Sequence, residues 1–429
     1  MKKKFYPIYI LLLLCFLANV SCNNDDSQIE PPVEEVVLSE EVEVYKADKL
    51  ENSLTLAVIN GGKSSYLVDK KGEILKVWDF DIALGNDLEL LPDGKLLGIF
   101  KAANLSFSFG GFGGIVRIIN LDGSIDWEFN YHSENYLAHH DVEMLPNGNV
   151  LIIAWERILA LDAKNMGIDV NHDVFTESLI EVNPSNDQIV WEWHTKDHLV
   201  QDIDINLPNY GVVKDNPQLI NHNYTKSADG NLMHINGIDY DPIKDVIYMS
   251  VNFYSEVWVI DHSTTAIESS LHEGGTYNRG GDLIYRFGNP EAYNNTLGKR
   301  LFYNNHFPNF LESDELGAGN VLIFNNNYNA GQSTVHEFQM PANFELNPNE
   351  DNEPLEVWSF TDTNLYNPRI SGAVRLKNGN TLICEGDYGL WEVTPQKEIV
   401  WKYNGNNKGN FWRAYNYSLT DSEIINLKL

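Results

Sequence analysis

Short apolar runs alternate with polar positions along most of the chain, and several runs pair around an Asp-Gly or Asn-Gly dipeptide. Three such pairs lie at residues 88–99, 142–153 and 373–384. Asp-Gly and Asn-Gly adopt the positive φ angles of a two-residue hairpin, and the flanking alternation is typical of half-buried strands. We therefore predict three β-hairpins. Residues 234–250 and 306–324 follow the same plan with longer turns.

A second type of strand, built on a tryptophan or a tyrosine, recurs downstream of the hairpins. Its six copies lie at residues 74–78, 125–129, 189–193, 283–287, 355–360 and 399–403. An all-β unit that repeats over tens of residues is typical of a propeller of four-stranded blades around a channel. The predicted fold is an all-β, six-bladed β-propeller, in which we expect the tryptophans to pack the blades.

Two long insertions interrupt the repeat, at residues 195–231 and 261–281. Long excursions from a compact ring are usually lids or binding loops. Both insertions are therefore candidates for the surroundings of a functional site.

Three consecutive hairpins carry a histidine at corresponding places. His140 lies ten residues before the second strand of its hairpin, and His234 and His306 lie twelve and fifteen residues before theirs, the difference being taken up by longer turns. By the same count, Asn86 and Ser371 hold this place in two other blades. A single histidine at a strand start is usually structural. Three in one register would face one axis in a closed ring, so we predict a site there.

Converging imidazoles favour nucleophilic chemistry. A neutral imidazole is a competent nucleophile near neutral pH, and a covalent intermediate splits one transfer into two easier displacements. Zinc binding is the alternative, because imidazole suits zinc. We rank it lower and expect no metal or cofactor, since the sequence fixes no carboxylate or thiolate beside the three histidines. The acidic alternations at residues 141–143 and 239–241 lack the ligand density of a calcium loop.

The N-terminus is predicted to be a secretory signal. Three lysines precede an apolar run at residues 8–17 that is too short to span a bilayer comfortably. The run ends at Asn19-Val-Ser-Cys22, which resembles a bacterial lipoprotein cleavage site. We therefore expect Cys22 to carry lipid and to anchor the protein in the periplasm or at the outer membrane. An acidic run after this cysteine is a weak signal for export to the outer surface.

The chain is expected to have four parts. They are a signal at residues 1–22, an acidic solvated tether at 23–48, the propeller at 49–417 and a tail at 418–429. The formal net charge of −31 makes nucleic acid a poor partner. Cys384 would be left as a lone cysteine, so stability must come from a large core and not from disulfides.

Several motifs resemble the bacterial arylsulfate sulfotransferases. They lie at residues 139–149, 231–241, 258–265, 281–290 and 370–386, and the likeness runs from about residue 50 to about residue 417. The resemblance implies a six-bladed propeller enzyme that moves a sulfuryl group from a phenol ester to another phenol without a nucleotide donor. The partners it implies are a small phenolic donor and a small phenolic acceptor.

The resemblance assigns the nucleophile to His306 and assisting roles to His140 and His234. Sulfuryl transfer is expected to pass through a loose state with charge on its oxygens, so positioned donors matter most. The two assisting histidines would supply such donors or protonate the departing phenolate.

The sequence departs from the family pattern at two places. Asn252 stands where better-known members have an arginine, so we predict that Asn252 binds the substrate through neutral hydrogen bonds and that Arg413, or else Arg369, supplies the charge. Phe307 follows the predicted nucleophile, so no adjacent carboxylate fixes the tautomer of His306.

Two other functions fit the same sequence. One is an inactive, anchored propeller that binds a glycan or a protein, which the asparagine and phenylalanine substitutions favour. The other is a metal-dependent lyase or hydrolase that acts on a polyanionic sugar through the same histidines. The strongly negative charge argues mildly against a polyanionic substrate.

Overall fold

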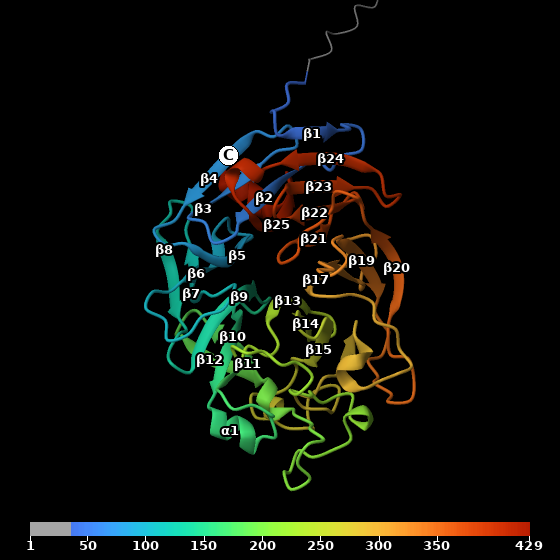
Figure 1. Cartoon of the computed structure of the whole chain (residues 1–429). Helices are drawn as coiled ribbons and strands as arrows, with labels where there is room; N and C mark the ends of the chain where they lie inside the picture. The colour runs from blue at the N-terminus through green and yellow to red at the C-terminus, as the bar shows by residue number, and fades with distance from the viewer. Residues whose placement is uncertain (1–35) are drawn as a thin grey trace, which may run out of the picture. The chain divides into compact units, whose positions relative to one another are not determined.

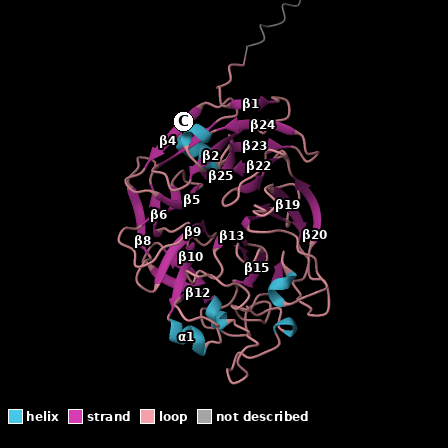
Figure 2. Cartoon of the chain, in the orientation of Figure 1, coloured by secondary structure: helices cyan, strands magenta, loops and turns pink. Residues whose placement is uncertain are grey.

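The computed structural model describes residues 36–429, and its strands form six antiparallel sheets (Figures 1 and 2). The six-bladed β-propeller predicted from the repeats is confirmed. The predicted signal, with Cys22, and half of the predicted tether lie outside the described residues. Within those residues, neither short helix has the length and apolar character to cross a membrane.

Each blade contributes one innermost strand to the central channel. In ring order these strands are β25 (Phe411–Ser418), β5 (Leu84–Leu90), β9 (Tyr136–Met144), β13 (Ile235–Asp241), β17 (Asn305–Phe310) and β21 (Gly372–Arg375). Each contacts the innermost strand on either side, from β25 round to β21 and back to β25. The ring is therefore closed, and equivalent positions of the inner strands face one channel.

The two middle strands of each blade continue the antiparallel order outward. The second strands are β2 (Ser53–Ile59), β6 (Leu96–Lys101), β10 (Val150–Ile158), β14 (Val246–Val251), β18 (Val321–Asn325) and β22 (Thr381–Glu385). The third strands are β3 (Ser64–Val68), β7 (Gly114–Ile119), β11 (Val174–Asn183), β15 (Glu256–Asp261), β19 (Thr334–Gln339) and β23 (Gly389–Val393). The predicted hairpins are the inner two strands of blades two to six.

The aromatic repeats form the fourth strands. These are β4 (Ile74–Asp79), β8 (Ile125–Asn130), β12 (Gln188–His194), β16 (Tyr285–Phe287), β20 (Leu355–Phe360) and β24 (Ile399–Asn404). Five of their indole N–H groups donate to neighbouring segments: Trp127 to Asp187, Trp191 to Thr264, Trp193 to Gly281, Trp358 to Pro395 and Trp401 to Lys70. These tryptophans pack neighbouring blades, as the sequence predicted.

The two ends of the propeller domain pair with each other in two places. The C-terminal strand β25 pairs with β2, so the first blade combines both ends of the domain (Figure 1). Strand β1 (Val42–Tyr45) pairs with β24 on the outer edge of the sixth blade. Residues 42–45 were expected to belong to the tether, and the structure instead places them in this blade.

The apolar core is divided among the interfaces between blades. Six clusters of buried residues each join two neighbouring blades. Cys384 is buried in the cluster between the sixth and first blades and is a free thiol. Because every blade is held by both neighbours, the apolar core stabilises the whole ring.

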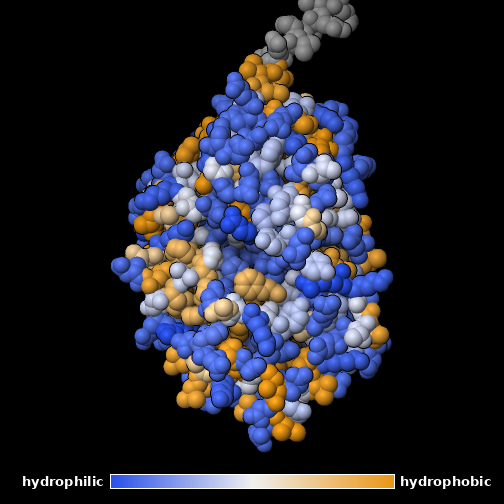
Figure 3. All heavy atoms as spheres, viewed as in Figure 1, coloured by the Kyte–Doolittle hydropathy of each residue, from blue (hydrophilic) through white to orange (hydrophobic). Residues whose placement is uncertain are grey.

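The insertions contain few regular elements. Short 3₁₀ turns at residues 195–197, 213–215 and 268–270 are embedded in loops. Helix α1 (Ala160–Asn165) follows β10, and helix α2 (Ser422–Leu427) packs Ile424 and Leu427 on the first two blades. The face seen in Figure 3 is mostly hydrophilic with scattered apolar patches, in keeping with the acidic composition.

Arg413, on β25, crosses the channel and bonds to other inner strands. Its guanidinium lies 2.8 Å from Asp141 Oδ1 on β9 and 3.4 Å from Asp87 Oδ1 on β5, and it donates to the carbonyl oxygen of Asn236 on β13 at 2.9 Å. It also lies 4.0 Å from the ring centroid of Phe307 on β17. One side chain therefore joins the closing strand to four other blades.

The charge of this arginine is balanced within the channel. Burial, together with the neighbouring Asp141 charge, raises the pKa of Asp87 to about 8, so Asp87 holds a proton near neutral pH. Arg413 and Asp141 then form the charged pair, and both are almost fully buried. A buried ion pair of this kind leaves an uncompensated charge when either partner is removed.

Other carboxylates of the inner strands bind the backbone of the next blade. Each of three accepts an N–H from the neighbouring inner strand: Glu89 from Met144 at 3.3 Å, Asp141 from Ile238 at 2.8 Å and Asp239 from Phe310 at 2.7 Å. The first acidic residue of each alternation noted in the sequence, Asp141 and Asp239, therefore connects two blades.

Replacement of Arg413 by methionine is expected to lower the free energy of unfolding by about 3–5 kcal/mol, because Asp141 would be left buried without its partner. The double variant Arg413→Met/Asp141→Asn should recover part of this loss. Denaturant unfolding of both proteins measures the difference, with the partly exposed Arg279→Met as the matched control. Equal stability of Arg413→Met and Arg279→Met would contradict the assigned role.

Candidate active site

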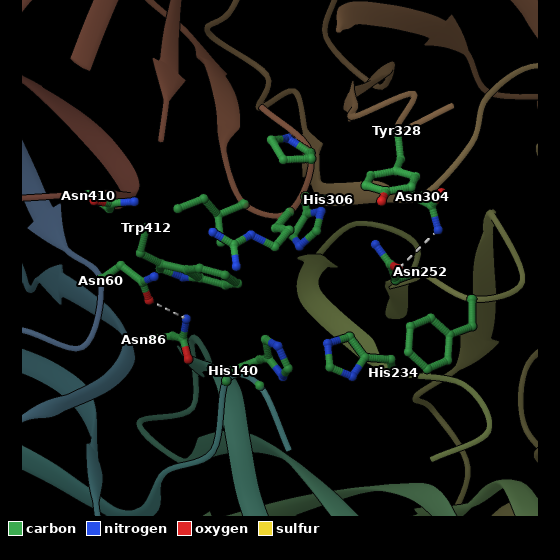
Figure 4. A pocket seen from close by; sticks show the side chains of 16 residues that line it. Asn60, Asn86, His140, His234, Asn252, Asn304, His306, Tyr328, Asn410 and Trp412 are labelled. Carbon is green, nitrogen blue, oxygen red and sulfur yellow. Dashed lines mark hydrogen bonds between the residues drawn. The ribbon is translucent and has the colours of Figure 1, made fainter. Parts of the chain in front are cut away.

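A cavity of about 440 Å³ lies where the inner strands begin, and the three predicted histidines all line it (Figure 4). The ring centroids of His140 and His234 are 4.7 Å apart. Trp412, on β25, lies 5.6 Å from the ring of His140 and 5.9 Å from that of His306. Side chains from three consecutive blades and the closing strand thus converge on one space, as the register of the repeats predicted.

Irregular strands aim these histidines into the cavity. The pairing of β9, β13 and β17 with the next strand is interrupted beside each histidine. His140 and His234 adopt left-handed backbone angles, with φ of 57° and 59°, and in the third strand Phe307 does so with φ of 51°. Left-handed residues other than glycine cost about 1–3 kcal/mol each and cluster at functional sites. The ring is therefore strained where the histidines meet.

Asn326, at the end of β18, fixes the tautomer of His306. Its Oδ1 lies 2.6 Å from His306 Nδ1, and its Nδ2 donates to the carbonyl oxygens of Asn367 and Ile370 at 2.7 and 2.8 Å. The two carbonyls determine which end of the amide faces the imidazole. Nδ1 of His306 must therefore carry the proton, and Nε2 keeps its lone pair. The asparagine does what an adjacent carboxylate would otherwise do.

Burial keeps the imidazoles neutral. Loss of solvation lowers the pKa of His234 and of His306 to about 3, and it lowers that of His140 well below its usual range. The other histidines and the positive charge of Arg413 add to the effect at His140 and, in part, at His306. Uncharged imidazoles with free lone pairs are the form that nucleophilic attack requires.

His234 is oriented by an amide and by an aromatic ring. Asn231 Nδ2 lies 2.8 Å from His234 Nδ1, so donation from the amide leaves the imidazole proton on Nε2. The ring of Phe253 stacks on His234 at a centroid distance of 4.9 Å and also lines the cavity. His234 can therefore present an N–H group to a substrate oxygen.

His140 is the end of a buried chain of three titratable side chains. His140 Nδ1 lies 2.7 Å from His139 Nδ1, and His139 Nε2 lies 2.8 Å from Glu177 Oε2 on β11. His139 and Glu177 are fully buried, and the histidine ring stacks on Trp155 at 3.7 Å. Burial raises the pKa of Glu177 and lowers that of His139. His139 is thus buried behind His140.

The remaining lining combines amides, aromatic rings and one arginine. The amides belong to Asn60, Asn86, Asn252, Asn304 and Asn410, and the rings to Phe253, Tyr328 and Trp412. Asn252 therefore lies at the cavity, where the sequence placed a substrate-binding group. Arg413 does not line this cavity. Its guanidinium is held beneath the histidines by buried partners and lines a separate cavity of about 150 Å³. Arg369, which is exposed, lines the histidine cavity instead.

Two side chains that shape the site were missed by the sequence reasoning. Glu177 lies in the middle of a buried strand, where an acidic residue carries no local signal of its partner. Asn326 is the second of three consecutive asparagines at the end of β18, and only the fold shows which of them faces the imidazole.

A closed six-bladed propeller with three neutral imidazoles at one cavity defines the structural class of this protein. The sequence profile of the arylsulfotransferase (ASST) family matches residues 40–416, and the chain belongs to this family. A comparison with curated proteins finds no match.

Solved structures resemble the chain only distantly. A protein of unknown function from Desulfotomaculum acetoxidans is 12% identical, with 85% of this chain and 98% of that chain covered and a TM-score of 0.44. BamB from Moraxella catarrhalis is 11% identical, with 85% and 80% covered and a TM-score of 0.36.

His306 is expected to remain neutral, with the proton on Nδ1, from pH 8 down to pH 5, because its lowered pKa places protonation well below this range. Nitrogen chemical shifts of selectively labelled protein measure both the tautomer and the titration. Asn326→Leu should give a mixture of tautomers. A midpoint near the ordinary histidine value of about 6.5 in the native protein would contradict the proposed burial effect.

Proposed function

We propose that the protein transfers a sulfuryl group from an aryl sulfate to a phenol through a covalent intermediate on His306. The observation that carries the proposal is the Asn326 contact, which leaves Nε2 of a neutral imidazole with a free lone pair at the cavity. Membership of the arylsulfotransferase family supports the reaction class.

The reaction divides into two displacements. In the first, Nε2 of His306 attacks sulfur, an N–S bond forms, the bond from sulfur to the aryl oxygen breaks, and the departing phenolate takes a proton from His140. In the second, the oxygen of the acceptor phenol attacks sulfur, the N–S bond breaks, and the phenol proton goes to His140. Each displacement passes charge to oxygens that positioned donors can stabilise.

The chain behind His140 allows this residue to act first as an acid and then as a base. When Glu177 is protonated, it donates to His139 Nε2, His139 donates from Nδ1 to His140, and His140 carries its own proton on Nε2. When His140 gives up that proton, one proton moves along each of the two hydrogen bonds. Glu177 is then anionic, and His140 Nε2 has a lone pair for the acceptor proton. The raised pKa of Glu177 sets the acid form as the starting state.

The sulfate group would be held by donors from several blades. His234 offers its Nε2 proton, Asn252 offers an amide, and Arg369 supplies the positive charge that Asn252 lacks. Trp412 and Phe253 form aromatic walls on which an aryl group can pack. Arg413 acts from below by holding the inner strands in place.

The geometry gives less support to a metal-dependent reaction at the same histidines. Among the described residues, three possible ligand atoms come within 4.8 Å of one another at His198, His272 and Asp282, and not at the cavity histidines. Loss of activity on addition of a chelator would therefore test for a metal-dependent reaction directly.

Replacement of His306 by alanine is expected to abolish transfer from p-nitrophenyl sulfate to a phenol acceptor. His140→Ala and His234→Ala should each reduce the rate by about a hundredfold or more, as is typical for a lost acid or electrostatic donor. Release of nitrophenol in the presence and absence of acceptor and chelator measures the effect. The exposed His172→Ala serves as the matched control.

The outcomes separate the three candidate functions. Acceptor-dependent release that resists the chelator supports sulfuryl transfer. Release that the chelator stops would move the assignment to a metal enzyme, and the absence of turnover would favour a binding propeller. Full activity of His306→Ala would reject the assigned nucleophile.

Glu177→Gln tests the proton chain. Glutamine can still accept the N–H of Ile235, which Glu177 Oε1 accepts at 3.0 Å, but it cannot release a proton. We expect the first displacement to slow by about 10²-fold for phenyl sulfate, whose leaving group needs a proton, and by much less for p-nitrophenyl sulfate.

Single-turnover release of each phenol measures this dependence on the leaving group. An equal loss for both substrates, or a large fall in the unfolding midpoint, would show that Glu177 has only a structural role. The wild type measured with both substrates provides the reference.

A further inference from the structure

The two long insertions meet at a cluster of three side chains remote in sequence from the cavity histidines. His198 ends the 3₁₀ turn of the first insertion, and His272 and Asp282 belong to the second insertion and its end. Nδ1 of His198 and Nδ1 of His272 each lie 2.8 Å from the same oxygen, Oδ1 of Asp282. His198 and Asp282 are buried, whereas His272 is largely exposed.

The hydrogen bonds of a neutral His198 leave no hydrogen atom between its Nδ1 and the carboxylate of Asp282. Its Nε2 lies 2.8 Å from the carbonyl oxygen of Ser269, so Nε2 must carry a proton. In the neutral imidazole, Nδ1 then presents a lone pair to the carboxylate oxygen of Asp282. Two lone pairs at 2.8 Å repel unless a proton or a metal ion lies between them.

We propose that His198, His272 and Asp282 form a binding site for a divalent transition-metal ion of the zinc type. Two imidazole nitrogens and one carboxylate oxygen are ligands that zinc prefers, and three protein ligands with water at the fourth position form a common open site. In a tetrahedral zinc site, ligand atoms lie about 3.3 Å apart. The two nitrogen-to-oxygen separations of 2.8 Å would widen by about half an ångström around such an ion, and all three ligand atoms already lie within 4.8 Å of one another.

The surroundings of His198 are those of a metal ligand. Zinc-binding histidines commonly donate their second N–H to a backbone carbonyl, which fixes the tautomer, and Ser269 accepts this bond. Trp193 stacks on the imidazole with an interplanar angle of 7° and a centroid distance of 5.8 Å. A Cβ atom at Gly281 would lie 2.6 Å from His198 Nε2, so the glycine makes room for the ring.

The exposed side of the cluster is open to solvent. His272 lines a hollow of about 420 Å³ together with Lys196 and Asp197. Water can therefore reach the position that the protein leaves free. This arrangement suits exchange of a metal from solution better than a closed structural site does.

The bound ion would fasten the two insertions together. The first insertion continues to residues 224–227, which line a further hollow with Phe253 and Asn304, and both of these also line the histidine cavity. Metal binding would thus stabilise a segment that borders the cavity without taking part in the chemistry there.

Zinc binding to tag-free full-length protein tests the proposal. Competition with a chromophoric chelator is expected to show one zinc ion per chain, and saturating zinc is expected to raise the midpoint of thermal unfolding. His272→Ala and Asp282→Asn should each weaken binding by at least tenfold and remove the thermal shift. The exposed His172→Ala is the matched control and should bind as the wild type does.

Two further results distinguish this site from the cavity. Zinc binding retained in His306→Ala and in His140→Ala supports the cluster. Loss of zinc binding in either of these variants would overturn the proposal. So would unchanged zinc binding in His272→Ala, or a wild-type protein that binds no zinc. None of these measurements depends on sulfuryl transfer, so a failure of the proposed reaction leaves the test intact.

Discussion

The buried contact between Arg413 and Asp141 is the interaction on which the rest of the structure depends most. The arginine lies on the strand that closes the ring, and it reaches four other inner strands directly beneath the histidines. A propeller that closes with its last strand needs a strong, specific contact at that strand, since otherwise the ring could open between the first and sixth blades. The contact also fixes the spacing of the blades, and so the distances between side chains at the cavity.

The same burial that makes this contact strong prepares the imidazoles for reaction. Loss of solvation lowers the pKa of each histidine above the ion pair, so these side chains remain neutral, and the nearby arginine charge further opposes protonation of His140. Each imidazole has its Nδ1 held by a neighbour: an asparagine at His306 and at His234, and a second histidine at His140. Nε2 is therefore the nitrogen that each ring can offer to a substrate. The strained backbone at His140 and His234 is stable because inter-blade contacts surround it.

Much of the fold followed from local patterns. Hairpin turns, apolar alternation and one aromatic residue per repeat indicated six blades, and counting from the hairpins placed three histidines at one axis. The inner strand pair of the first blade could not be recognised as a hairpin. It joins β25 to β2, and the residues of these two strands lie more than three hundred positions apart in sequence. The role of Arg413 was hidden for the same reason: its partners come from other blades, and sequence spacing gives no information on them.

The supporting groups of the site were the least predictable. The absence of a carboxylate after His306 suggested a poorly oriented imidazole, yet Asn326 supplies the acceptor from the neighbouring strand of the same blade. Likewise, Glu177 lies 38 residues from His139 in the chain, but the register of β9, β10 and β11 brings it behind the paired histidines. Contacts of this kind depend on strand register and on bulges, which the sequence determines only through the completed fold.

Sulfation of His306 during turnover is the step on which the proposed reaction depends. The most direct measurement is mass spectrometry of the peptide that contains His306, after brief exposure of the protein to an aryl sulfate without acceptor and a rapid quench at alkaline pH. The expected result is a sulfo-adduct on His306 that disappears when a phenol is added. An unmodified His306 in protein that transfers sulfate at the normal rate, or an adduct on a different residue, would contradict it.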